Sequence, residues 1–157
     1  MEPEKRVETR LPPKPRVFVD ADVLFAGSAS PNEHSASNLI LRMAELTLIE
    51  AICSVQVITE VERNLQGKMP KALPAFRLLV SRCLKIVEDP ESSELTEFDG
   101  LANQEDLPIL VAAIREECSL LTTFNLRHYQ PGHPDVAVLK PGDLILRVRY
   151  LLARLSD

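Results

Sequence analysis

The sequence predicts an α/β domain with three layers, in which helices cover both faces of a central parallel sheet of about five strands. Short, solidly apolar segments alternate along the chain with longer segments whose apolar residues recur at helical spacing. Strands that are apolar on both faces suit a sheet that is buried on both sides. The alternation of strands with helices is typical of a parallel sheet, so one α/β/α domain is expected.

Length and composition fit a single packed domain. The chain has 157 residues, of which 45% are hydrophobic and 26% are charged. The net charge of −5 argues against a strongly basic nucleic-acid clamp, but not against carboxylates gathered around a cation. The sequence has neither a membrane-spanning run of roughly 18 apolar residues nor an apolar signal core, so we expect a cytoplasmic protein without a membrane partner. Three widely spaced cysteines are expected as reduced core thiols: Cys53, Cys83 and Cys118.

The chain begins with a segment that differs from the rest. Residues 1–15 are polar and rich in proline, so we expect a flexible N-terminal tail before a domain that spans residues 16–157. Val17–Val19 is an apolar run of strand length, and it ends at Asp20. A further apolar stretch, 23–26, is broken by a segment that contains glycine, serine and proline.

The middle of the chain alternates between helical and strand patterns. Apolar residues recur at helical spacing over 35–50, and a buried strand is expected at 51–55. Two helices should follow, one over 57–66 with Gly67 as its stop and one over 72–84.

The last part of the chain contains the remaining predicted strands. A strand at 84–87 precedes a polar, acidic segment at 91–104, which is expected to be a loop or lid that could contain a short helical turn. Asp106 opens the clearest helix of the chain, because Pro108 falls in the first turn, where its missing N–H costs nothing. The elements expected after this helix are strands at 119–123 and 136–139, a loop between them, and a final helix that starts at Pro141.

Carboxylates lie where the predicted strands end, which is the edge at which ligands bind in parallel sheets. The fold would bring three acids together there, although Asp20, Glu60 and Asp106 are far apart in sequence. Their charges repel unless a cation lies between them, and oxygen ligands of this kind suit Mg²⁺ or Mn²⁺. Such an ion lowers the pKa of a bound water and stabilises charge on phosphate oxygens, which indicates phosphodiester cleavage. Other polar residues at this edge are Asp22, Thr123 and Asn125.

The residue types alone leave some of these assignments open. By charge, Glu62 is as good a candidate as Glu60, and Glu105 stands beside Asp106. Asp106 could also serve only as the N-cap of its helix. The pair His128–Tyr129 is expected to pack as a structural corner rather than to act in catalysis.

Four segments resemble the four motifs of PIN domains in order, spacing and context, from Arg16 to about Leu146. The second motif selects Glu60 rather than Glu62. The most similar subgroup comprises toxins of toxin–antitoxin pairs. The four segments are Val17–Leu24, Thr59–Leu65, Asp106–Ile114 and Leu121–Tyr129.

The resemblance implies a metal-dependent ribonuclease with the strand order 3-2-1-4-5, an RNA substrate and a cognate antitoxin as partner. It implies that Asp20, Glu60 and Asp106 hold Mg²⁺ or Mn²⁺, with Asp22 and Asn125 completing the ligand set and Asn125 sharing in catalysis. The remaining candidates are Thr123, for a supporting hydroxyl, and Arg127, for a contact to substrate phosphate.

Two departures from the motifs keep alternatives open. Position 22 is commonly Asn in the family and is Asp22 here. The position of the fourth motif that is often Asp in the family is Asn125 here. A PIN module that binds RNA or a protein partner without cutting is therefore one alternative. A phosphatase of the haloacid-dehalogenase type is another, because the segment 20–23 fits its first motif, but its final acidic pair is missing. The long apolar stripe from Leu144 to Leu155 also leaves a homodimer open.

Overall fold

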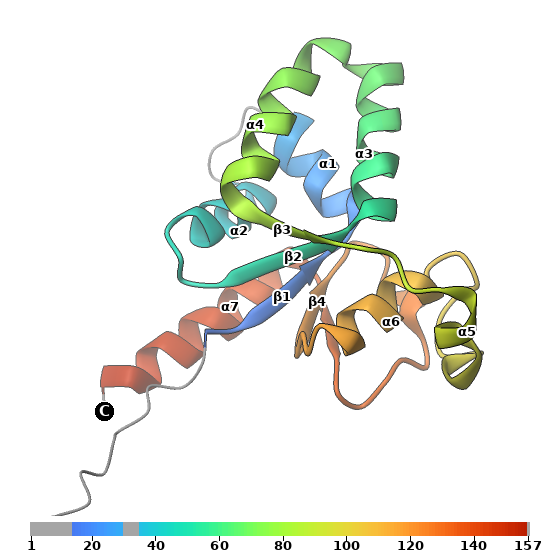
Figure 1. The fold of residues 1–157 in the computed structure, drawn as a ribbon. Coiled ribbons are helices and arrows are strands. Elements are labelled where there is room, and N and C mark those ends of the chain that lie inside the picture. Colours follow the sequence, from blue (N-terminus) through green and yellow to red (C-terminus); the bar gives the residue numbers. More distant parts are fainter. Residues whose placement is uncertain (1–13, 30–34, 157) are drawn as a thin grey trace, which may run out of the picture.

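The computed structural model describes residues 14–29 and 35–156, so the expected N-terminal tail lies almost wholly outside the described residues. Within them, five strands form one parallel sheet in the order β3-β2-β1-β4-β5 (Figure 1). This confirms the predicted fold class and strand order. The strands are β1 (Arg16–Val19), β2 (Glu50–Ser54), β3 (Leu84–Val87), β4 (Leu120–Thr122) and β5 (Ala137–Leu139).

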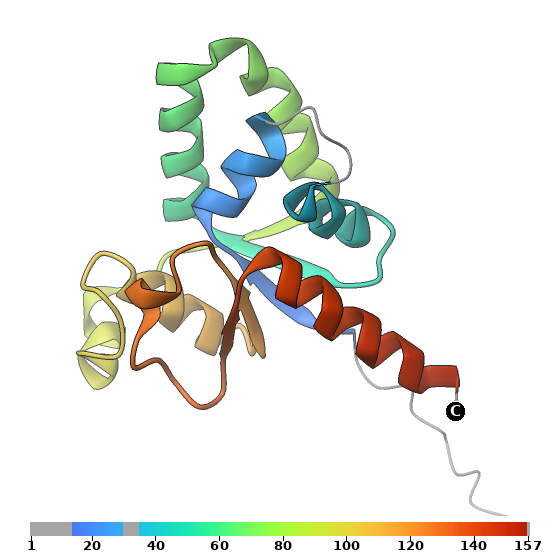
Figure 2. The same cartoon turned by 180° about the vertical axis from the view of Figure 1, so that it is seen from behind.

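Helices pack on both sides of the sheet. In Figure 1, α1, α3 and α4 stand together above the strands, whereas α6 and the short α5 lie below them. Helix α7 packs against α2, as the reverse view in Figure 2 shows. None of the described helices has both the length and the apolarity that crossing a bilayer requires. The α-helices are α1 (Ala21–Ala29), α2 (Ala36–Glu45), α3 (Val55–Lys68), α4 (Leu73–Cys83), α5 (Ser92–Leu95), α6 (Leu107–Arg115) and α7 (Pro141–Ala153). Short 3-10 helices are η1 (Pro70–Ala72), η2 (Thr96–Phe98), η3 (Leu126–Tyr129) and η4 (Arg154–Ser156).

The central strand β1 determines where the polar residues of the first motif lie. Its residues Val17–Val19 are fully buried, because strands flank β1 on both edges and helices cover its faces. Val19 lies opposite Thr122 of β4, and the next N–H, that of Asp20, donates to the Thr122 carbonyl at 3.0 Å. The residues that follow the two strands, Asp20 and Thr123, are thereby placed next to each other.

Helix α1 is the element that the sequence pattern does not indicate. Its residues are mostly apolar and show no amphipathic period, so periodicity cannot distinguish it from an extension of the strand. In the structure the Asp20 carboxylate accepts the Ala21 N–H at 2.8 Å and so satisfies a free donor at the helix start. Gly27 allows α1 to approach α2 closely, because a Cβ at this position would lie 2.8 Å from the Leu41 side chain.

Two predicted helix boundaries are wrong. The helix expected over 35–50 ends at Glu45, because Thr47 turns the backbone into the left-handed region with φ 63° and the buried Ile49 leads into β2. Helix α3 continues through Gly67, the expected stop. That glycine is exposed and its position is not crowded, so it costs the helix only about 1 kcal/mol relative to alanine.

The cysteines only partly match the expectation of core thiols. Cys53 and Cys118 are buried, and this burial raises the pKa of both thiols to about 12. Thiols in such surroundings are unreactive. Cys83 is only half-buried at the end of α4, so the expectation is wrong for this residue.

Candidate functional site

A cleft of about 560 Å³ lies beside the carboxyl ends of β2 and β3, between α3 and the start of α6. Four of its lining residues are acidic, and Arg63 is the one Lys or Arg among the described lining residues. The lining residues are Gln56, Thr59, Glu60, Arg63, Asn64, Asp89, Glu105 and Asp106. Of the three acids predicted to come together, Glu60 and Asp106 line this cleft. Asp20 is not among the lining residues, and neither are the strand-end residues Asp22, Thr123 and Asn125.

Asp20 is held rigidly behind this cleft. It is only 7% exposed, and its Oδ1 accepts the Ala21 N–H. Its Oδ2 accepts hydrogen bonds from the Thr123 hydroxyl at 2.9 Å and from the Tyr129 hydroxyl at 2.7 Å. Burial and the Asp20 charge raise the pKa of the Tyr129 phenol far above its ordinary value, so this hydroxyl remains a donor. Donors from α1, the end of β4 and η3 thus fix the orientation of one carboxylate.

Asp22 lies in the first turn of α1 and also faces the end of β4. Its Oδ2 accepts the Phe124 N–H at 3.0 Å and the Asn125 side-chain amide at 3.1 Å. The Thr123 hydroxyl lies 3.3 Å from the same oxygen, so its single proton can serve either Asp20 or Asp22. The other oxygen, Oδ1, is buried and meets no donor in hydrogen-bonding geometry within the described part of the chain.

Glu60 and Asp106 complete the acidic side of the cleft from two other helices. Burial and the charges of Asp20 and Asp106 raise the pKa of Glu60. Burial and the Asp20 charge raise the pKa of Asp106, although the neighbouring His128 opposes that shift. These carboxylates are therefore close enough to disfavour one another's charged forms.

The side chain of Asp106 does not cap its helix. Asp106 occupies the N-cap position of α6, but its carboxylate accepts no capping hydrogen bond. Its Oδ2 lies 3.2 Å from Nδ1 of His128 instead. His128 is exposed, so the expected packed corner is correct only for the buried Tyr129.

The alternatives that the residue types left open occupy different places. Glu62 is 3.4 Å from Arg77 and does not line the cleft, whereas Glu105 lines it beside Asp106. Arg127 is exposed on η3 and does not line the cleft. Sequence reasoning missed Arg63, which lies three residues after Glu60 and therefore on the same helix face.

The ligand chemistry of the site suits a hard divalent cation. Over residues 14–29 and 35–156, no Lys or Arg lies within 4 Å of a carboxylate oxygen of Asp20, Asp22 or Glu60. Buried carboxylates without a cation are costly, and the unpartnered Oδ1 of Asp22 is an oxygen that Mg²⁺ or Mn²⁺ would accept. The same described residues contain no group of three or more acidic, histidine or cysteine side chains already arranged to hold a metal ion. The donor set therefore fits the ion, and the side chains would have to gather around it.

The half-buried Asp22 carboxylate predicts a pH-dependent stability of the metal-free protein. Burial and the Asp20 charge raise the pKa of Asp22 from 3.8 to about 6, so the folded state favours the protonated form. Its contribution to stability is complete below pH 3.8 and is lost as the pH rises through about 6. Asp22→Asn is expected to raise the thermal midpoint at pH 7.5 by about 2–4 °C, which corresponds to roughly 1 kcal/mol for a screened, partly exposed group.

The gain in thermal midpoint should shrink as the pH falls below about 6 and vanish near pH 4. Asp99→Asn changes an exposed carboxylate and is the matched control, with no change expected at any pH. Equal midpoints of Asp22→Asn and the unmodified chain at pH 7.5 would contradict the electrostatic strain at Asp22.

Comparison with known proteins gives one family match and one informative fold match. A family model described as PIN domain matches residues 16–127. A chain of the solved structure of VapBC2 from Rickettsia felis bound to a DNA fragment from their promoter is similar, with a TM-score of 0.58 and 17% identity. The similarity covers 80% of the present chain and 98% of that chain. No curated protein matches the sequence. The family model runs from β1 into η3, and it includes the first three motifs in full and the fourth up to Arg127.

Proposed function

The chain belongs to the PIN domain family, and from this premise we propose that it is a metal-dependent endoribonuclease that hydrolyses RNA phosphodiester bonds at the acidic cleft. Proteins of this family are generally nucleases. The observation that carries the proposal is the grouping of Asp20, Asp22, Glu60 and Asp106 around one edge of the sheet, with no Lys or Arg within ion-pair distance of the first three in the described structure. An RNA phosphodiester is the substrate class that such a cation-binding edge can polarise.

The proposed ligands are the carboxylates of Asp20, Glu60 and Asp106, joined by Asp22 and by the side-chain oxygen of Asn125. When bound, Mg²⁺ or Mn²⁺ would lower the pKa of a water and neutralise charge on the phosphate. Asp20 contributes a carboxylate whose orientation is fixed by three donors. No hydrogen bond within the described structure holds the exposed Glu60 carboxylate, so it can turn toward an ion.

The reaction proposed here is hydrolysis. An oxygen–phosphorus bond to water forms, the bond from phosphorus to the 3′ oxygen breaks, and the products are a 3′-hydroxyl and a 5′-phosphate. The haloacid-dehalogenase alternative would leave Glu60 and Asp106 without a role, although both line the cleft. The non-cutting alternative predicts that the chain binds RNA without cleaving it in the presence of Mn²⁺ or Mg²⁺.

The function is tested by incubating the purified chain with a mixed pool of single-stranded RNA. We expect cleavage with Mn²⁺ or Mg²⁺, none with EDTA, and recovery when Mn²⁺ is added back. Products that carry a 5′-phosphate are the expected chemical signature. No cleavage with either metal, or cleavage that EDTA leaves unchanged, would contradict the proposed function.

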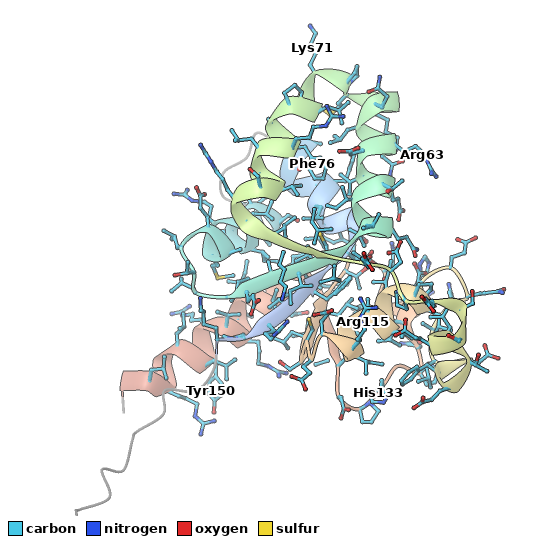
Figure 3. All side chains as sticks on the ribbon, viewed as in Figure 1. Arg63, Lys71, Phe76, Arg115, His133 and Tyr150 are labelled. Atoms are coloured by element: carbon cyan, nitrogen blue, oxygen red, sulfur yellow. The ribbon has the colours of Figure 1, made fainter. Side chains whose placement is uncertain are left out.

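Arg63 is the residue proposed to bring RNA to this acidic edge. It lines the cleft with Glu60 and Asp106, and its side chain points away from α4 in Figure 3. In the described part of the chain no acidic oxygen lies within 4 Å of it, so it forms no close ion pair that a phosphate would have to replace. Its charge acts on Glu60 only by opposing the rise in the pKa of that carboxyl. Arg63→Gln is expected to raise KM for RNA about 5- to 10-fold with little change in kcat.

The salt dependence of RNA binding provides a second readout for Arg63. The logarithm of the RNA-binding constant falls linearly with the logarithm of the salt concentration. Loss of one phosphate contact on a single strand reduces the magnitude of this slope by about 0.7. Arg82→Gln on α4, outside the cleft, is the matched control and should change neither quantity. Equal KM and equal slope in Arg63→Gln and Arg82→Gln would contradict the phosphate contact.

We propose in addition that the chain acts as a cytoplasmic toxin whose antitoxin covers the acidic cleft. The subgroup resemblance of the motifs and the fold shared with a chain of the VapBC2 structure support this. Inhibition of RNA cleavage by the purified product of the neighbouring gene is the expected result, and the absence of inhibition would contradict it.

A further inference from the structure

Three side chains of the short segment Asn125–Tyr129 each contact a different carboxylate of the cleft region. The Asn125 amide donates to Oδ2 of Asp22 at 3.1 Å. Nδ1 of His128 lies 3.2 Å from Oδ2 of Asp106, and the Tyr129 hydroxyl donates to Oδ2 of Asp20 at 2.7 Å. The three acids come from three places in the chain: the end of β1, the first turn of α1 and the N-cap of α6.

We propose that Asn125–Tyr129 is a positioning segment, whose Asn125, His128 and Tyr129 side chains set the separation and orientation of the three aspartates for a divalent cation. The inference rests on the proposed function, because it assigns to these side chains the task of preparing that function's cation site. Tyr129 and His128 are positioning residues here, since they act through Asp20 and Asp106.

The backbone of the positioning segment is itself anchored on both sides of the site. The Asn125 N–H donates to the Thr123 hydroxyl at 3.1 Å, and the His128 N–H donates to the Asn125 carbonyl at 3.1 Å. The His128 carbonyl accepts the Asn103 N–H at 2.7 Å, just before α6. The segment therefore spans from the end of β4 to the helix that carries Asp106.

The contacts leave ligand capacity on each carboxylate. All three use Oδ2, so the segment does not occupy Oδ1 of Asp20, Asp22 or Asp106. Oδ1 of Asp20 accepts one N–H and keeps a lone pair, and within the described residues no hydrogen bond of standard geometry reaches Oδ1 of Asp22. A side chain that hydrogen-bonds to one oxygen of a metal-binding carboxylate orients the other oxygen toward the metal. The loss of such a side chain weakens metal affinity.

The identity of residue 125 follows from the same geometry. An amide can donate to the Asp22 carboxylate, whereas a carboxylate at position 125 would face another carboxylate at about the 3.1 Å now spanned by the hydrogen bond. A chain with Asn at position 22 and Asp at position 125 would again have one amide donor and one carboxylate acceptor. The hydrogen bond would then run in the opposite direction, and the net charge would be unchanged.

The first experiment removes one hydroxyl. Binding of Mn²⁺ to the full chain is measured by isothermal titration for the unmodified protein, Tyr129→Phe and Tyr150→Phe. Tyr150 is 60% exposed on α7, where the Arg154 guanidinium lies over its ring, and it does not line the cleft, so its substitution is the matched control (Figure 3). We expect the dissociation constant to rise about 10- to 100-fold in Tyr129→Phe and to stay unchanged in Tyr150→Phe.

The second experiment uses an exposed position and needs no metal. Thermal midpoints of the metal-free chain are compared for Asn125→Asp in the native background and in the Asp22→Asn background. We expect Asn125→Asp to lower the midpoint by several degrees in the native background and to leave it unchanged beside Asp22→Asn, where the hydrogen bond is restored. The same change in both backgrounds would overturn the contact between residues 22 and 125 as a positioning contact.

The outcomes separate this inference from the proposed function. If the unmodified chain takes up no Mn²⁺, both fail. If it binds Mn²⁺ and Tyr129→Phe binds it equally well, even with a lower thermal midpoint, the tyrosine is merely structural and the positioning segment is overturned alone. Weaker Mn²⁺ binding in Tyr129→Phe at an unchanged Tyr150→Phe affinity supports the positioning segment.

Discussion

Asp20→Asn is expected to lower the rate of RNA hydrolysis by at least about 100-fold. The substitution replaces a charged oxygen at the centre of the acidic edge, and even residues that only orient a metal ligand are worth about 10- to 100-fold. Asparagine has nearly the same shape, so the hydrogen bonds that Asp20 now accepts from Ala21, Thr123 and Tyr129 can be largely rearranged without disturbing the core. The initial rate of cleavage of a single-stranded RNA with Mn²⁺ is the measurement.

The control for Asp20→Asn is a check that the variant is folded as the unmodified chain is. A thermal midpoint and a far-ultraviolet spectrum close to those of the unmodified chain show that the loss of rate arises in the cleft. A variant that keeps more than about half of the rate would mean that the activity comes from elsewhere, including a contaminating nuclease.

A second large effect is expected for one of two neighbouring glutamates on α3. Glu60→Gln should lower the cleavage rate by about 100-fold, because it removes a carboxylate that lines the cleft and interacts with Asp20 and Asp106. Glu62→Gln should leave the rate unchanged, since Glu62 lies beside Arg77 at 3.4 Å and outside the cleft.

The glutamate pair is a sharp comparison because both substitutions make the same chemical change on the same helix, two residues apart. The rates are measured with identical RNA and Mn²⁺ concentrations. Equal losses of rate in the two variants, or a loss only in Glu62→Gln, would contradict the assignment of Glu60 rather than Glu62 to the proposed active site.

The fold could be predicted from the sequence where a local pattern has one solution. The run Val17–Val19 is apolar on both faces, which suits an inner strand of a covered sheet, and the structure places it there. Helix α6 begins where Asp106 and Pro108 indicate. Helix α1 lacks an amphipathic period, and the end of α2 depends on the backbone conformation of Thr47, so neither follows from hydrophobic pattern.

Some contacts of the candidate site could be predicted from the sequence, and others could not. The rule for strand ends places Asp20 at the sheet edge, and the register of the second motif selects Glu60 over Glu62. The contact of Tyr129 with Asp20 joins residues 109 positions apart, so no local spacing reveals it. The partner of Asp106 is likewise His128 rather than its own helix, a choice that only the packing of η3 beside α6 determines.

The most direct test of the account is Mn²⁺ binding by the unmodified chain and by Asp20→Asn, Glu60→Gln and Asp106→Asn, measured by titration calorimetry at one pH and salt concentration. We expect saturable uptake by the unmodified chain and at least about 10-fold weaker uptake in each variant, because the proposed function assigns the three acids to one cation site. Absence of uptake, or equal affinity in all four proteins, would contradict it.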